Sequence, residues 1–479
     1  MTPDGLPVSL EDRVALRIAG DRSVRRVVML FFGSALFWLL LGSVFGLVTS
    51  LKFQWPDLWS DTAWLTFGRI RPAHLNTMAY GWSSLAGLGA AVWLVARLTG
   101  TRLLHERLAL ASVLLWNTAV GAGTIAILAG QSSGMEWLEF PRWAGVILAI
   151  AGAPVGLSLL AMVRRRTLPH MYVSLWYLVG AIFWFPMLYI MANAPVWSGV
   201  DQAAMNWWYG HNVLGFWFTS LSLGTIYYLM PKIIGRPIYS YQLSLLGFWG
   251  LAFFYSLVGI HHLIGGPLPD WVVSVSIVAS VLMVIPVVAV GYNHHMTTFR
   301  HFGALRWSPT LRFIVFGAVS YTLVSLQGSL EALRFFNRVV HFTHYTVAHA
   351  HFGLYGFVAM VLFGAVYYIV PRVAEREWPY PRLIFAHFWL SVIGFGLYFI
   401  GLSIGGWKQG IAMLDASRPF LESVTVTLPY LASRSVAAVI LTVAHLIFIG
   451  HFTLVALRCG PARTTPAVLR DLPDSVPNS

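Results

Sequence analysis

The sequence His341-Phe-Thr-His-Tyr-Thr-Val-Ala-His-Ala-His351 leads into a hydrophobic run that ends near Val370. That run is long enough for a transmembrane helix, which needs roughly 20 apolar residues. His349 and His351 are two residues apart, so a helix of 3.6 residues per turn rotates one from the other by about 200°. The two imidazoles therefore point to opposite flanks, and such a helix can stand between two cofactors and ligate both. The alternative is a pair of polar side chains hydrogen-bonded inside a helix bundle.

The composition is that of an all-α polytopic membrane protein. Of the 479 residues, 57% are hydrophobic and 10% are charged. Twelve stretches have the length and apolar character of a membrane span, and short connections join them. We expect a single membrane domain. The expected spans are 27–50, 73–98, 108–130, 142–163, 171–193, 206–230, 241–264, 271–292, 311–333, 346–370, 383–406 and 432–457.

The expected membrane domain covers residues 27–458, with a short segment on each side. Residues 1–26 contain four acidic residues and no recognisable cleavage site. We therefore interpret them as a cytoplasmic, amphipathic lead-in and not as a signal peptide. Residues 459–479 form an expected cytoplasmic tail.

Basic residues predict the orientation of the helices, because cytoplasmic loops are enriched in lysine and arginine. With the N-terminus in the cytoplasm, the two tails and the even-numbered loops carry 22 of the 31 lysines and arginines, and the outer loops carry 9. Topology therefore explains the net charge of +13, which does not indicate nucleic-acid binding.

Cys459 is the only cysteine. The chain therefore has no internal disulfide, and it lacks the Cys-x-x-Cys-His motif that attaches a c-type haem. Electrons from such a haem would have to come from another protein.

Two arginines precede a histidine in Phe67-Gly-Arg-Ile-Arg-Pro-Ala-His74. Pro72 suits a first helical turn, which places His74 at the outer end of the second span. Arg69 and Arg71 lie on the outer side of the membrane, where basic residues are depleted. They therefore suggest a fixed anionic partner such as haem propionates. Ordinary solvation of the loop is the alternative.

A pair of acidic residues lies in the outer segment Gly134-Met-Glu-Trp-Leu-Glu139. Glu136 and Glu139 are three residues apart and could share a helical face that binds calcium. Two carboxylates are far fewer than the six to eight ligands that calcium takes. A solvated acidic loop is the simpler interpretation of this segment alone.

Six histidines are expected at one depth in the outer half of the membrane, near the outer ends of four spans. Unpaired imidazoles are costly in hydrocarbon, so six at one level indicate metal binding. The six are His74, His211, His261, His262, His349 and His351.

The other ten histidines are expected to be surface or packing residues, with His341 the most plausible exception. Five are expected in cytoplasmic loops and one near such a loop; His445 and His451 lie deeper in the last span. The ten are His105, His170, His294, His295, His301, His341, His344, His387, His445 and His451.

These motifs resemble subunit I of the haem–copper oxidases, specifically the cbb3-type (C-family) cytochrome c oxidase. The resemblance covers essentially the whole chain. The motifs that carry it are Gly-Arg-Ile-Arg-Pro-Ala-His74, Trp-Trp-Tyr-Gly-His211-Asn, Arg236-Pro-Ile-Tyr-Ser-Tyr241, Tyr255 with His261-His262, and His349-Ala-His351, in that order.

The resemblance implies a ligand set for three metals. His74 and His351 would be the axial ligands of a low-spin haem b, and His349 the proximal ligand of a high-spin haem b3. His211, His261 and His262 would bind the copper ion, CuB, above the open face of that haem. Imidazole suits both haem iron and copper, and three neutral ligands leave a position for dioxygen.

The resemblance also implies roles in proton transfer. Tyr255 would be covalently joined to His211 and would supply an electron and a proton. On a continuous helix, Tyr255 would lie about 9 Å below His261 and be rotated from it by about 240°, which still lets it reach beneath the copper toward His211. Tyr227, Ser244 and Tyr321 match the family's proton pathway, although each could be a hydroxyl satisfied within its helix. Glu136 and Glu139 match a segment near a calcium in relatives.

Two positions depart from the family pattern. Gln327 stands where these oxidases usually carry a glutamate near haem b3, and Gly247 where the proton pathway usually has a histidine. Neither removes a metal ligand, but both put proton delivery or pumping in doubt.

Three functions remain open at this point. The first is a terminal oxidase that reduces O2 to water and translocates protons. A nitric oxide reductase shares the scaffold but has a glutamate one turn after the first histidine of the copper set and lacks the tyrosine. Here those positions are Gly215 and Tyr255. A transporter or a cytochrome b-like carrier would need only the low-spin haem pair.

The resemblance implies membrane-anchored mono- and dihaem c-type cytochromes as electron donors. It also implies a place in the inner membrane of a bacterium. The lipid bilayer is the other expected partner, and no nucleic acid is expected.

Overall fold

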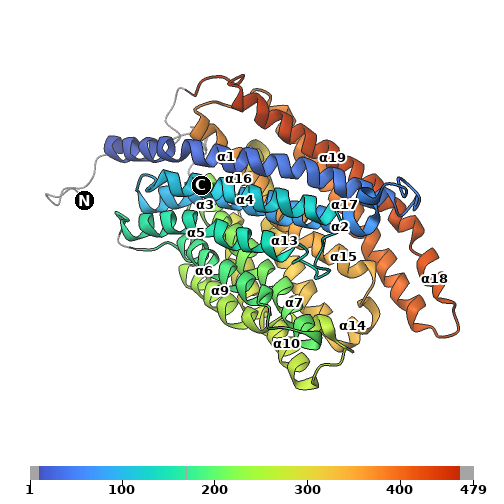
Figure 1. Ribbon diagram of the computed structural model, residues 1–479. Coiled ribbons are helices and arrows are strands. Elements are labelled where there is room, and N and C mark those ends of the chain that lie inside the picture. The colour runs from blue at the N-terminus through green and yellow to red at the C-terminus, as the bar shows by residue number, and fades with distance from the viewer. Residues whose placement is uncertain (1–9, 169, 464–479) are drawn as a thin grey trace.

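The computed structural model describes residues 10–168 and 170–463, and nearly all of these residues are helical. The described residues contain twelve helices or helix pairs that are long and apolar enough to cross a membrane. Each overlaps one of the twelve expected spans, so the all-α polytopic prediction is confirmed. The helices run side by side along one direction, with α1 beginning at the end opposite α18 (Figure 1).

Nineteen α-helices make up this bundle in the described residues. They are α1 Leu10–Leu51, α2 Phe67–Asn76, α3 Ser84–Thr99, α4 Glu106–Leu128, α5 Arg142–Arg164, α6 Val173–Asn193, α7 Gly199–Val213, α8 Ser220–Ile234, α9 Tyr241–Phe254, α10 Asp270–Leu282, α11 Val284–Thr298, α12 Ala304–Trp307, α13 Pro309–Glu331, α14 Arg334–Val340, α15 His344–His351, α16 Met360–Ala374, α17 Pro381–Leu414, α18 Phe420–Thr425 and α19 Leu428–Ala456.

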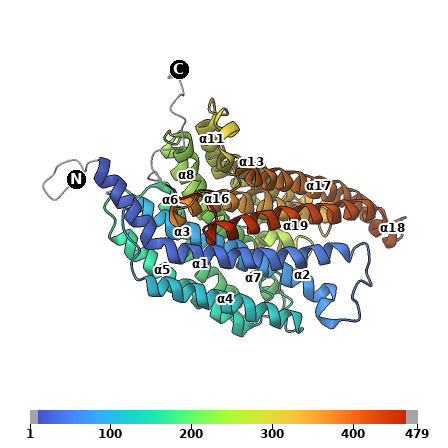
Figure 2. The ribbon, with the colours of Figure 1, turned by 90° about the horizontal axis from the view of Figure 1, so that it is seen from above.

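The first helix is longer than expected. The sequence predicts a span from residue 27, whereas α1 is continuous from Leu10. Residues 1–9 and 464–479 lie outside the described residues, so the division into lead-in, membrane domain and tail stays a prediction. Helix α1 packs against α3 and α19, and α17 packs against α19 (Figure 2). Helix α17 also packs against α15.

Three spans contain a π-helical segment in the middle. These segments join α2 to α3, α7 to α8 and α15 to α16; they are Thr77–Ser83, Leu214–Thr219 and Phe352–Ala359. Each begins within three residues of a histidine, namely His74, His211 or His351. A π-segment adds a residue to a turn and so redirects the side chains beside it, and such segments are frequent at functional sites. All three segments contribute residues to the lining of one cavity, among them Met78, Leu214 and Gly353.

The seventh span is not a continuous helix, which corrects the expected geometry of Tyr255. Helix α9 ends at Phe254, and two short 3₁₀ turns, Tyr255–Leu257 and Ile260–Leu263, follow it. Gly259 between them has a φ of +117°. A Cβ atom there would lie 2.6 Å from the Trp207 carbonyl oxygen. Only glycine allows this approach to α7, so the break brings His261 and His262 toward His211.

A second correction concerns His294. It was expected in a cytoplasmic loop, but it lies inside α11 and only 1% of its surface is exposed; His295, expected in the same loop, also lies inside α11. His387, His445 and His451 are also buried, as packing residues would be.

Candidate metal and cofactor centre

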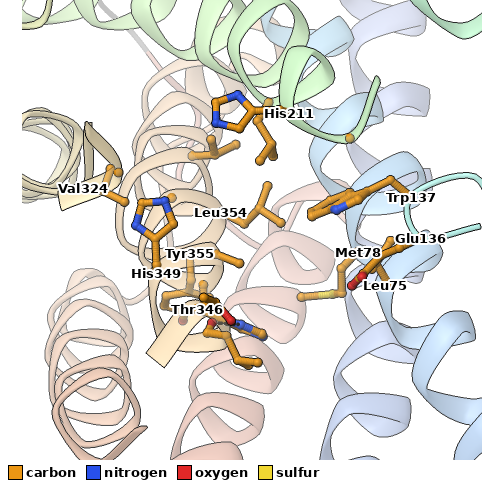
Figure 3. A pocket seen from close by; sticks show the side chains of 18 of the residues that line it. Leu75, Met78, Glu136, Trp137, His211, Val324, Thr346, His349, Leu354 and Tyr355 are labelled. Atoms are coloured by element: carbon orange, nitrogen blue, oxygen red, sulfur yellow. Dashed lines mark hydrogen bonds between the residues drawn. The ribbon is translucent and has the colours of Figure 1, made fainter. Parts of the chain in front are cut away.

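One large cavity lies between the helices that carry the six histidines. Its volume is about 970 Å³, and it is lined by five of them: His74, His211, His262, His349 and His351. Figure 3 shows the rings of His211 and His349 directed into this cavity. The volume is at the upper end of the range of ~300–1,000 Å³ typical of cofactor sites.

His211, His261 and His262 form a group that could hold a metal ion. One nitrogen from each lies within 4.8 Å of the others. Nδ1 of His261 lies 3.1 Å from the Ser276 hydroxyl and 3.2 Å from that of Ser280. These contacts occupy Nδ1 and leave Nε2 as the atom that can bind a metal, which is how a metal-binding histidine is usually oriented. Among the described residues this is the only such group of three or more side chains.

His74 and His351 face each other across the cavity wall. Their rings are 6.5 Å apart and within 10° of parallel. Nδ1 of His74 lies 2.7 Å from the Gly42 carbonyl, and Nδ1 of His351 lies 2.9 Å from the Val347 carbonyl. Both rings therefore donate through Nδ1 and keep Nε2 as an acceptor. Since metal–imidazole bonds are about 2 Å long, one metal ion fits between the rings.

His349 has a buried carboxylate beside it that the sequence did not reveal. Nδ1 of His349 and Oε1 of Glu331 are 3.5 Å apart, and the Glu331 side chain is only 9% exposed. Gln327 lies one turn earlier on α13. The family pattern has a glutamate at position 327. In this chain the carboxylate beside His349 comes instead from Glu331, one turn later.

Tyr255 lies directly beside His211. The centres of the two rings are 4.9 Å apart. A Cβ atom added to Gly215 would collide with the Tyr255 ring. The absence of a side chain at 215 is therefore what leaves room for this tyrosine.

The two predicted arginines behave differently. Arg71 lines the cavity and pairs with Glu136, whereas Arg69 donates to the Leu128 carbonyl at 3.0 Å. Another cavity-lining arginine, Arg434, lies over the rings of Phe53 and Tyr398 and was missed. It sits inside the last span, where no sequence motif marks it.

Glu136 and Glu139 both lie beside Arg71, and they do not form a shared carboxylate face. Glu139 is 3.9 Å from Arg71 and accepts a hydrogen bond from Asn76 at 3.0 Å. This arrangement gives no support to the predicted calcium ion, because Arg71 lies between the two carboxylates and no group of three or more His, Cys, Asp or Glu ligands in the described residues includes them.

Burial raises the pKa of Glu139 from its ordinary 4.5 to about 7. Between these values the folded chain keeps a proton that the unfolded chain releases, so its stability falls as the pH rises. We expect Glu139→Gln to remove part of the loss of thermal stability between about pH 5 and pH 8. Melting curves of the two proteins at both pH values measure this. Glu136→Gln is the control, and equal pH dependence in all three proteins would contradict the assignment.

Of the three residues predicted for a proton pathway, only Tyr321 lines the cavity, where it lies together with Tyr255. Tyr227 and Ser244 are fully buried, and the Ser244 hydroxyl donates to the Tyr241 carbonyl at 2.6 Å.

Comparison with known proteins agrees with this geometry. Residues 26–440 match the family described as cytochrome C and quinol oxidase polypeptide I. The chain belongs to this family. It is a haem–copper oxidase subunit I, and the family is one of oxidoreductases.

Two similar relatives of this subunit I come from bacteria. The cbb3-type cytochrome c oxidase subunit CcoN1 of Stutzerimonas stutzeri is 31% identical over 432 residues, which is 87% of this chain and 91% of the relative. Cytochrome c oxidase subunit 1 of Rhodobacter capsulatus is also 31% identical, over 86% of this chain and 81% of the relative.

The fold of this subunit I is also that of a solved structure. A haem–copper terminal oxidase dimer determined by cryo-electron microscopy has a chain that aligns with a TM-score of 0.71 at 15% identity. The alignment covers 92% of this chain and 86% of that one.

Proposed function

We propose that this subunit catalyses the reduction of O2 to water in a bacterial terminal respiratory oxidase that couples the reaction to proton translocation. The observation that carries the proposal is the packing of the Tyr255 ring against Gly215 and beside His211. A proton-donating phenol thereby stands next to a three-histidine group that has room for a metal and no fourth protein ligand at 215.

We propose the following ligands. His74 and His351 hold the low-spin haem b, His349 holds the high-spin haem b3, and His211, His261 and His262 hold copper. When bound, the first haem supplies electron transfer, and the second haem with copper supplies the open site at which O2 takes up electrons. The parallel rings of His74 and His351 suit a two-ligand haem. The Tyr398 hydroxyl, 3.2 Å from Nε2 of His351, would give up that contact.

The protein's own part in the reaction is to orient the ligands and deliver protons. Serine hydroxyls hold the ring of His261, and Glu331 lies against Nδ1 of His349. Tyr255 provides a proton and an electron close to the reacting O2, and its position on the cavity wall with Tyr321 lets it be reprotonated from the other half of the membrane. Tyr227 and Ser244 extend this path.

Arg71 and Arg434 are the proposed partners of the haem propionates, because both line the cavity near His74 and His351. The excess of basic residues in the tails and even-numbered loops supports a cytoplasmic N-terminus. The path through Tyr227 then opens to the cytoplasm, and c-type cytochromes deliver electrons from the outer side.

Nitric oxide reduction is the second candidate. It would need a glutamate at position 215, and no side chain fits there while Tyr255 occupies its present place. The structure therefore favours the oxidase.

Steady-state assays test the proposal directly. Purified enzyme supplied with a reduced c-type cytochrome should consume O2 with four electrons per molecule and acidify the outside of vesicles. Rapid reduction of nitric oxide without comparable O2 consumption would instead support the second candidate.

Glu331 gives a prediction that does not depend on turnover. A carboxylate beside Nδ1 makes a histidine a more electron-rich ligand and stabilises oxidised iron. We expect Glu331→Gln to raise the reduction potential of the high-spin haem by ~60 mV or more, equivalent to a tenfold change for a one-electron couple. Spectroelectrochemical titration measures the shift, and Gln327→Asn is the matched control one turn away. An unchanged potential in Glu331→Gln would show that the carboxylate has no influence on this haem.

A further inference from the structure

His294 is a buried imidazole that no part of the proposed centre uses. Within the described residues neither ring nitrogen has a hydrogen-bond partner, and its ring centre lies 4.5 Å from that of Tyr227. A histidine held in this way inside a membrane span is costly unless it has a function.

Two tyrosines close to His294, Tyr177 and Tyr227, also have buried polar atoms without a well-formed hydrogen bond. Tyr177 stacks on Tyr227 with ring centres 5.9 Å apart. Both hydroxyls are buried, and neither makes a hydrogen bond of good geometry in the described part of the chain, although the Asn293 side chain lies beside the Tyr227 hydroxyl. Buried polar groups are almost always satisfied, by ordered water where protein groups are out of reach. These three residues, which we call the His294 cluster, therefore form a polar site suited to internal water between α6, α8 and α11.

The His294 cluster lies below the central cavity on a shared helix face. Met283, which joins α10 to α11, and Val287 of α11 line the cavity. His294 follows Val287 by seven residues, which is two turns and about 10 Å along the helix on nearly the same face. Tyr321 and Tyr255 line the cavity wall above. The cluster thus stands between the cavity and the end of the bundle where α11 finishes.

Gly247 explains why the imidazole comes from α11. A Cβ atom at 247 would collide with Cγ2 of Val290 and lie 3.4 Å from the Tyr177 hydroxyl. Helix α9 therefore packs directly against α11 here and adds no polar side chain at 247. A side chain at 247 would lie beside Val290 and the Tyr177 hydroxyl, and His294 follows Val290 by one turn on the same face of α11.

We propose that His294 is a proton-relay residue of this oxidase, passing protons from the Tyr177 and Tyr227 hydroxyls toward Tyr321 and Tyr255. An imidazole suits this role because one nitrogen can accept a proton while the other releases one. No electron moves in the step. The inference rests on the proposed function, since only a proton-consuming centre needs the relay.

The test measures proton uptake when fully reduced, purified oxidase reacts with O2 in the presence of a pH-indicator dye. In His294→Leu we expect uptake and steady-state O2 reduction to slow by ~100-fold, with both haem spectra unchanged. His301→Leu, in an exposed loop, is the matched control and should behave as the parent. Parental proton uptake in His294→Leu with intact spectra would overturn the proposal.

Two further variants keep the test decisive. If His294→Leu does not assemble, His294→Gln preserves polarity without relaying protons; slow uptake supports the proposal and parental uptake overturns it. The triple variant Gly247→His, Val290→Ala, His294→Gly returns an imidazole from α9 and should recover most of the rate. A triple variant with intact spectra that stays as slow as His294→Leu would mean that the ring is structural. A parent that does not reduce O2 would refute the proposed function separately.

Discussion

Replacing His74 or His351 by alanine is expected to remove the low-spin haem and leave one haem per chain. The two rings are parallel and 6.5 Å apart on different helices, so neither alone can hold iron in a six-coordinate site. The rate of electron transfer to the second haem should fall with the loss of the low-spin haem. Haem content and the low-spin absorption band, measured on purified protein, give the result.

His451→Ala is the matched control for these variants. His451 is also a buried histidine, but it contacts Trp378 and lies away from the cavity. The His451→Ala variant should retain both haems. A normal low-spin spectrum in either His74→Ala or His351→Ala would show that the ligand assignment is wrong.

Tyr255→Phe is expected to reduce O2 at a rate at least ~100-fold below the parent, because a positioned proton donor contributes this much or more. The haem spectra and metal content should not change, since the hydroxyl is no ligand. Mass spectrometry of a digest of the parent should also find the peptides of Tyr255 and His211 covalently linked, as the adjacent rings allow.

Tyr345→Phe, a tyrosine on α15 outside the proposed path, serves as the control and should keep the parental rate. Separate Tyr255 and His211 peptides in active enzyme would refute the cross-link. Parental oxygen reduction in Tyr255→Phe would refute the role of the hydroxyl itself.

Much of the fold follows from the sequence because one physical rule dominates it. Backbone polar groups in a bilayer must be satisfied within helices, so apolar stretches of sufficient length identify the spans. Ionisable side chains are costly in hydrocarbon, so histidines within the spans are conspicuous. Five of the six expected ones line one cavity, and the sixth, His261, completes the three-histidine group.

Other features depend on packing between distant segments and have no local pattern. The turn at Gly259 makes sense only because α7 passes within 2.6 Å of where its Cβ would be. In the sequence, Arg434 is an isolated charge within an apolar span. Only the structure shows that its guanidinium lies over the rings of Phe53 and Tyr398. The continuous helix expected around Tyr255 was wrong for the same reason.

The two departures from the family pattern have a common physical explanation. At Gln327 the nearby carboxylate is Glu331, one turn along the same helix, and at Gly247 the nearby imidazole is His294 on a neighbouring helix. The sequence shows which residue occupies a position, but the chemistry of a site depends on where the functional group lies in space. In both places a group of the same type comes from another backbone position: Glu331 follows Gln327 by one turn, and His294 follows by one turn Val290, which a side chain at 247 would meet.

The metal content of purified protein, determined together with a carbon monoxide difference spectrum, tests the central claim most directly. The account predicts two haem irons and one copper per chain, with carbon monoxide binding to only one of the haems. Iron in excess of the haems and no copper would contradict the copper site, and the absence of a haem that binds carbon monoxide would contradict the oxidase as a whole.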